Sequence, residues 1–203
     1  YLASVTCVDH CLGLVLDALN SSDHAGNTVI ALFSDHGFHL GEKERWAKRS
    51  LWEDGTRVPV IVSAPGFKPE QKSDRPAELL DLFPTLLELA GLPSDPSQEG
   101  QSLVPLMKNP KMEWKHPAIT SFGLGNYSVR STRYRFIRYF DGSQELYDLS
   151  EDPHEWKNLA AIPKFKSIIQ QHSAHLPKNA HPVLPGDSTG HRAYEAANAN
   201  IKK

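Results

Sequence analysis

The stretch Thr28-Val29-Ile30-Ala31-Leu32-Phe33-Ser34-Asp35-His36-Gly37 decides the fold class of this chain. Its first part, 28–33, is a short apolar run rich in β-branched residues. Such a run is typical of a strand covered on both faces, as in a parallel sheet. Proteins of the α/β class bind ligands outside the carboxyl ends of their strands, so we predict that Asp35 and His36 lie at such a site.

The segments on either side of this stretch support an α/β body. Apolar residues recur at helical spacing over residues 1–20, and a second strand-like run follows at 58–62. The polar and aromatic residues between 37 and 58 show no period, and long loops of this kind are functional or disordered. Asp81 and Gly91 carry the start and stop signals of a further helix.

The C-terminal half has a different pattern. Short strand candidates follow one another closely, Asp141-Gly142 predicts a hairpin turn, and Pro163 opens a helix. We therefore predict an α/β body over 1–110, a small antiparallel α+β subdomain over 111–180 and an irregular tail over 181–203. The strand candidates are Ala118–Ser121, Tyr127–Ser131, Tyr134–Phe140 and Glu145–Leu149.

Composition places the chain among ordinary globular proteins. It has 203 residues, 39% hydrophobic and 23% charged, with a net charge of -2 that would recruit neither nucleic acid nor an anionic membrane. No uninterrupted apolar stretch reaches the length of a membrane span, and we expect none. The chain starts at Tyr1 within an amphipathic pattern, without a signal peptide, which suggests a piece of a longer polypeptide.

Several side chains in and just before the loop are able to bind a cation or a tetrahedral anion. Asp35 and His36 are both able to bind a cation, although imidazole is less usual for a hard ion such as calcium, and two ligands do not suffice. An Asx-type turn with a solvent-facing histidine explains the same residues equally well. Lys48 offers a point charge for a tetrahedral oxyanion, or is a solvated lysine. Trp46 offers a flat face for a ring, or for packing.

The order of motifs resembles the type I sulfatase family, especially its iduronate-2-sulfatase-like branch. The signature consists of 34–42 followed by Trp46-Ala47-Lys48. A lone Ser-Asp-His-Gly is shared across the alkaline-phosphatase superfamily, but here the flanking segments match in order as well. They are 15–19, 27–30, 58–61, 65–66, 81–91, 134–139 and 145–149, with Asp152, Pro153 and Glu155.

The resemblance implies a fold and a set of site residues. The fold would be the C-terminal part of an alkaline-phosphatase-like sandwich, a central mixed sheet flanked by helices, with the small antiparallel subdomain behind it. Asp35 and His36 match the second pair of ligands to one calcium-type ion, and Lys48 matches the lysine that contacts the substrate's sulfate. His39 and Trp46 lie where a substrate would be lined.

The resemblance also implies what this chain lacks. The family's nucleophile is a formylglycine made from the cysteine or serine of a C/S-x-P-x-R motif, and neither Cys7 nor Cys11 stands in one. The first pair of metal ligands is absent too, so the missing N-terminal part of the polypeptide would supply both. We expect the intact enzyme to hydrolyse sulfate esters, in particular of sulfated carbohydrates, and this chain alone to be inactive. Family habit suggests an exported protein, whether periplasmic, secreted or lysosomal.

Two other functions stay open at this point. A phosphoesterase or mutase of the alkaline-phosphatase superfamily would share the strand-end motif and add histidine ligands for two metal ions; His116, His154 and His172 are candidates by residue type. A non-catalytic pseudoenzyme module is the second alternative. A C/S-x-P-x-R motif upstream would indicate a sulfatase, whereas a bare threonine or serine nucleophile would indicate a phosphatase.

Overall fold

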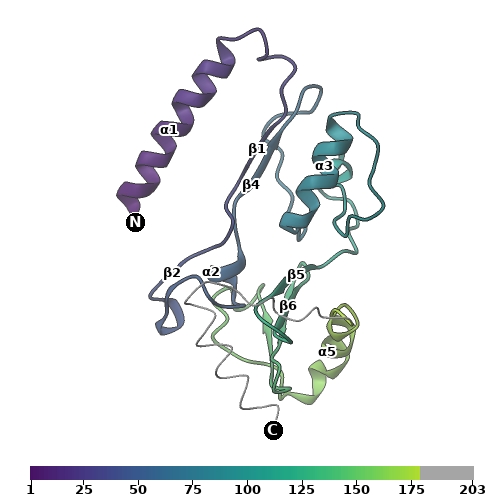
Figure 1. Cartoon of the computed structure of the whole chain (residues 1–203). Coiled ribbons are helices and arrows are strands. Elements are labelled where there is room, and N and C mark those ends of the chain that lie inside the picture. Colours follow the sequence, from purple (N-terminus) through teal and green to yellow (C-terminus); the bar gives the residue numbers. More distant parts are fainter. Residues whose placement is uncertain (179–203) are drawn as a thin grey trace. The chain divides into compact units, whose positions relative to one another are not determined.

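The computed structural model describes residues 1–178 and divides them into two compact units (Figure 1). The first unit comprises Tyr1–Ser34, Pro59–Ser73 and Leu80–Pro110. The second comprises Asp35–Val58, Asp74–Leu79 and the chain from Lys111 on, so the loop after the first strand groups with the C-terminal residues. The domain limits predicted from sequence stay a prediction, and the tail predicted over 181–203 lies outside the described residues.

The first unit contains a pair of strands that run antiparallel. Strand β1 (Ile30–Phe33) pairs with β4 (Val60–Ser63), in the register Leu32 with Ile61. The parallel pairing suggested by the first apolar run is therefore wrong. A parallel return needs a crossover of a dozen or more residues, usually a helix. The segment between β1 and β4 belongs instead to the second unit and contains no long crossover helix.

Two helices of the first unit follow the predicted spans closely, whereas α4 was not predicted. The 3-10 turn η2 (Leu79–Asp81) leads into α3 (Leu82–Leu89), and α4 (Val104–Lys108) packs beside it. Gly91 ends α3 with a φ of 67°, which only glycine adopts without strain. Its position predicted that Asp81 caps the helix, but its side chain makes no capping hydrogen bond. Its Oδ1 accepts the Gln101 N–H at 2.7 Å.

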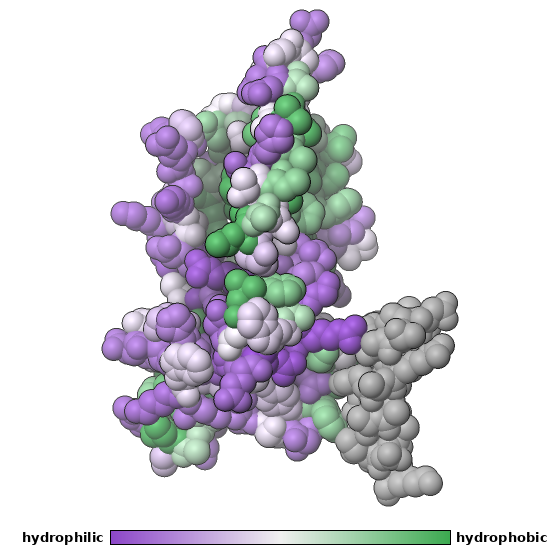
Figure 2. Space-filling model, turned by 90° about the vertical axis from the view of Figure 1, so that its left-hand side faces the viewer, coloured by the Kyte–Doolittle hydropathy of each residue, from purple (hydrophilic) through white to green (hydrophobic). Residues whose placement is uncertain are grey.

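Helix α1 (Leu2–Asn20) has no buried residue. Figure 2 shows apolar and polar residues mixed along the upper part of the molecule, where α1 faces the viewer. By length and hydropathy alone this helix could cross a membrane, although polar residues interrupt its apolar positions. Its apolar side chains lie exposed to solvent, Leu2, Val5, Val8, Leu14 and Val15 among them.

The second unit is built on a four-stranded antiparallel sheet in the order β5-β6-β7-β8. All the strand candidates of this region are confirmed, and Gly142, with a φ of 86°, lies in the predicted hairpin turn between the last two strands. The strands are β5 (Ala118–Ser121), β6 (Tyr127–Arg130), β7 (Tyr134–Arg138) and β8 (Gln144–Asp148).

Side chains alternate between the two faces of this sheet, as strand geometry requires. One face carries Val129, Phe136 and Leu146, all fully buried, and packs against η3 (Pro163–Phe165) and α5 (Lys166–Ser173). Burying each such side chain contributes about 1.5–3 kcal/mol. The opposite face carries Arg135 and Ile137 and packs against the loop 35–58. The sheet is thus the platform on which the candidate site loop rests.

Candidate functional site

His36 has one ring nitrogen committed to the backbone and the other facing a lysine. Nδ1 lies 2.7 Å from the Gly37 carbonyl oxygen, which only accepts, so Nδ1 carries the hydrogen. The Lys48 ammonium, which only donates, lies 2.5 Å from Nε2, so Nε2 presents its lone pair. A neutral imidazole fixed by a backbone carbonyl in this tautomer is the form that ligates a metal ion through Nε2.

Asp35 completes the set of donors at this point. Its Oδ2 lies 3.5 Å from His36 Nε2, and its side chain is 80% exposed against 32% for His36. The Asp35 carboxylate oxygen and the His36 Nε2 lone pair therefore lie close together, and the Lys48 ammonium lies beside them. The donors fit a divalent cation that takes its remaining ligands from elsewhere.

Gly37 permits the close approach of the backbone of Asp54 and Gly55, next to Asp35 and His36. Its N–H donates to the Gly55 carbonyl at 3.1 Å. A Cβ at residue 37 would stand 2.1 Å from the Asp54 carbonyl oxygen, which is far inside van der Waals contact. Glycine is needed at this position because α2 (Glu53–Thr56) packs directly against it.

A short hairpin presents the lysine and the tryptophan. Strand β2 (His39–Leu40) pairs with β3 (Trp46–Ala47) across the 3-10 turn η1 (Glu42–Glu44). Trp46 is 72% exposed, which suits a residue that lines a substrate site. Ala47, just before Lys48, has a φ of 82°, a strained conformation of the kind found at functional sites.

His39 lies in the interior of the loop. Its ring is fully buried and edge-on to Trp52, and Nε2 lies 2.7 Å from Ser50 Oγ. A substrate contact through His39, as the sequence predicted, would require the ring to leave this position.

Buried charges fasten the loop to the sheet. Arg135 is 3% exposed and pairs with Glu53 on one side and with Glu155 on the other, its Nε lying 2.7 Å from Glu155 Oε1. Arg130 also reaches Glu53, at 3.2 Å. Burial opposes ionisation of Glu53, but the charges of Arg135 and Arg130 outweigh it and hold the pKa of Glu53 below its usual range. Burial raises the pKa of Glu155 despite the nearby Arg135.

A second group of contacts holds η1 against the same face of the sheet. The Lys43 ammonium donates to the Glu155 carbonyl oxygen and lies 4.6 Å from the ring centres of Trp52 and Tyr147. The Trp52 indole N–H donates to Glu145 at 2.8 Å. Burial, followed by the charge of Glu145, raises the pKa of the Tyr147 hydroxyl, so this tyrosine remains a neutral donor.

Sequence reasoning missed this anchoring set. Glu53, Arg135 and Glu155 are far apart in the chain, and nothing in their local spacing links them. The alternation of arginines and aromatics in 134–140 was the available signal. In a strand with two covered faces, an arginine that alternates with buried aromatics needs an acidic partner.

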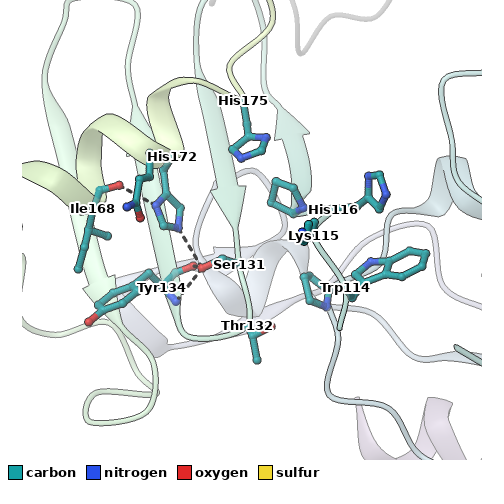
Figure 3. A pocket seen from close by; sticks show the side chains of 12 residues that line it. Trp114, Lys115, His116, Ser131, Thr132, Tyr134, Ile168, His172 and His175 are labelled. Carbon is teal, nitrogen blue, oxygen red and sulfur yellow. Dashed lines mark hydrogen bonds between the residues drawn. The ribbon is translucent and has the colours of Figure 1, made fainter. Parts of the chain in front are cut away.

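The candidate histidines of the phosphoesterase alternative do not gather at Asp35. His116 and His172 line one cavity of about 280 Å³ together with His175 (Figure 3). His172 belongs to α5, on the sheet face opposite the loop, and is occupied by Ile168 O and Ser131 Oγ at 2.8 and 2.9 Å. His154 lies apart, tilted against Trp156. Within residues 1–178, His39, Glu42 and Asp54 form the one group of three or more His, Cys, Asp or Glu side chains whose ligand atoms are close enough to share an ion.

Comparisons with known proteins give the family context. The Sulfatase family model matches residues 1–92. A sulfatase of Formosa agariphila is 47% identical over 178 residues, covering 88% of this chain and 35% of its own length. The Delta 4,5-hexuronate-2-O-sulfatase of Bacteroides thetaiotaomicron is 35% identical over 177 residues, covering 80% and 36%.

The solved structures agree. A protein in complex with its substrate D-glucosamine-2-N,6-O-disulfate superposes with a TM-score of 0.76 at 25% identity, over 89% of this chain and 42% of that one. The predicted alkaline-phosphatase-like class is thereby confirmed. The chain spans about a third of the length of the curated relatives it matches. The matched family region includes α1.

Proposed function

We propose that this chain, which belongs to the sulfatase family, supplies Asp35, His36 and Lys48 to the active site of a sulfuric ester hydrolase. The observation that carries the proposal is the Lys48 ammonium 2.5 Å from His36 Nε2, beside the Asp35 carboxylate. Hydrolysis of a tetrahedral sulfate ester needs cationic groups close to the sulfate oxygens. The Lys48 ammonium is one such group, and Asp35 and His36 are the donors that would hold a metal ion as the second.

Asp35 and His36 would hold one calcium-type ion through a carboxylate oxygen and the Nε2 lone pair. When bound, such an ion withdraws charge from the oxygens of the reacting group. Two donors do not complete its coordination, so further ligands would come from the part of the polypeptide outside this chain. The formylglycine nucleophile typical of the family would come from there as well.

Lys48 would act directly on the sulfate. An ammonium on a flexible stem donates to up to three oxygens and neutralises charge that grows as the ester bond breaks. The strained backbone at Ala47 and the anchoring set Glu53, Arg135 and Glu155 would hold the stem in place. We assign Ala47, Glu53, Arg135 and Glu155 a positioning role, because each would act through Lys48 and not on the sulfate itself.

We infer that the substrate is a sulfated carbohydrate. One relative is named a hexuronate-2-O-sulfatase, and one structural neighbour was solved with a disulfated glucosamine. The exposed indole of Trp46 gives a sugar ring an apolar face to stack on, close in sequence to Lys48.

We also infer that the rest of the polypeptide covers the exposed apolar side chains of α1, Phe33 and Ile61, and that this chain alone is inactive. The activity is tested on the full-length protein with an arylsulfate and a sulfated disaccharide, each with and without a calcium chelator. Sulfate release that the chelator abolishes supports the proposal. Faster release of phosphate from the matching phosphate ester would favour the phosphoesterase alternative, and turnover of neither ester would favour the pseudoenzyme.

A further inference from the structure

A second cluster of donors lies in the loop, separate from the Asp35–His36 pair. One ring nitrogen of His39, one carboxylate oxygen of Glu42 and one of Asp54 lie within 4.8 Å of one another. The three residues come from β2, η1 and α2, so the cluster is assembled by the fold of the loop and not by adjacent positions in sequence.

His39 is the member that points to a ligand. Its ring is fully buried, yet Nδ1 has no hydrogen-bond partner among residues 1–178. Buried polar atoms are nearly always paired, so this nitrogen calls for an explanation. Nε2, the other nitrogen, lies 2.7 Å from Ser50 Oγ. A histidine that binds a metal through one nitrogen usually donates from the other to an oxygen, as Nε2–H would do here.

The carboxylates of Glu42 and Asp54 give this cluster its negative charge. The Leu40 N–H donates to Glu42 Oε2 at 2.6 Å. Asp54 lies in the first turn of α2. Two carboxylates beside one ring nitrogen of the buried His39 form an arrangement that a cation stabilises.

We propose that His39, Glu42 and Asp54 bind one divalent transition-metal ion, of which Zn²⁺ is the best fit. One imidazole and two carboxylates with a water as fourth ligand suit zinc, whereas calcium prefers six to eight oxygens. Donors around a tetrahedral zinc ion lie about 3.4 Å apart, so the carboxylates must turn inward from their present spacing. They belong to the short elements η1 and α2.

A bound ion is expected to restrict the motion of the segment between His39 and Asp54, because it would link the two ends of that segment. This segment contains Trp46 and Lys48, so the ion would fix the hairpin that presents them. The effect on turnover rests on the proposed function, but zinc binding itself does not.

The test measures Zn²⁺ binding to the chelator-stripped full-length protein by equilibrium dialysis in excess Ca²⁺, with metal content determined by mass spectrometry. Wild type is expected to retain one zinc ion per chain through these residues. Asp54→Asn and Glu42→Gln should each weaken zinc binding by about tenfold or more, a loss at least as large as losing an outer-sphere partner. Glu44→Gln, in the same 3-10 turn but outside the cluster, is the matched control and should bind zinc as wild type does.

The carboxylate variants avoid disturbing the buried His39 ring, so loss of zinc cannot be ascribed to unfolding if their melting temperatures match that of the stripped wild type. Asp35→Ala should keep this zinc ion while losing calcium. Absence of zinc from wild type, or unchanged affinity in both carboxylate variants, would overturn the site. If zinc binding behaves as expected but no sulfate ester is turned over, the proposed function fails and the metal site stands.

Discussion

Lys48 Nζ lies 2.5 Å from His36 Nε2, so a lysine ammonium occupies the lone pair that the geometry otherwise offers to a metal ion. A cation at His36 and the ammonium cannot share that lone pair. Binding of the ion would therefore release Lys48 toward whatever anion the ion attracts. The ion and the ammonium would compete for His36 and would cooperate once a sulfate is bound, so their separate roles are measurable.

Replacing Lys48 by alanine should lower kcat/KM for an arylsulfate by about 10²–10³-fold, the usual effect of removing one charge-stabilising donor. Calcium affinity should stay the same or rise, because the competitor for His36 is gone. Steady-state kinetics and calcium titration of the full-length protein measure the two effects. Turnover equal to wild type would remove Lys48 from the active site.

Replacing Asp35 by asparagine should abolish the stabilisation of the full-length protein by calcium. Ligand at 100 times its dissociation constant stabilises a fold by about 2.7 kcal/mol, which appears as a raised melting temperature. The melting temperature without calcium should not change, because the Asp35 side chain is 80% exposed. A calcium-dependent shift that survives in the variant would show that Asp35 is not a ligand.

Replacing Gly37 by alanine should displace α2 and reduce activity, because the new Cβ would stand 2.1 Å from the Asp54 carbonyl oxygen. The loss of stability should fall in the range of about 1–3 kcal/mol for overpacked sites. Gly26→Ala is the control, since a Cβ there meets nothing within 4 Å. Urea unfolding and turnover give the comparison, and equal behaviour of both variants would contradict the packing described for Gly37.

Replacing Arg135 by methionine leaves Glu53 and Glu155 buried near each other without their shared partner. Removing one member of a buried ion pair costs about 3–5 kcal/mol. Arg138→Met, on the other face of the same strand and within 5.8 Å of the Tyr127 ring centre, should cost far less. Chemical denaturation ranks the two variants, and a smaller loss for Arg135 would show that the network does not hold the loop.

His172 should make stability depend on pH. Burial lowers its pKa below the ordinary value of 6.5, although the bond to the Ile168 carbonyl opposes this. At a pH between the two pKa values, His172 therefore binds a proton in the unfolded chain but not in the folded one. This contribution to stability is complete above about pH 6.5 and is lost as the pH falls toward the folded pKa. His172→Gln should flatten the pH profile of the free energy of unfolding over this window, while His154→Gln, an exposed control, should keep the wild-type profile.

Local patterns in the sequence were enough for much of the fold. The strands β5 to β8, the hairpin at Asp141-Gly142 and the end of α3 at Gly91 each depend on side-chain alternation or on a residue's backbone preference, which neighbouring positions reveal. The order of motifs around Ser34–Gly37 likewise indicated the sulfatase family, which the comparisons confirm.

The tertiary structure decided what depends on residues distant in the chain. The antiparallel direction of β4, the need for glycine at 37 and the Arg135 network all arise from segments that meet only after folding. The same holds for the tautomer of His36, which the Gly37 carbonyl and the Lys48 ammonium select together, and for the unpaired nitrogen of His39. The sequence by itself determined which residues could bind a cation or a sulfate, because that is set by side-chain chemistry. Burial and hydrogen-bond geometry determine which of them are free to do so, and these exist only in the folded chain.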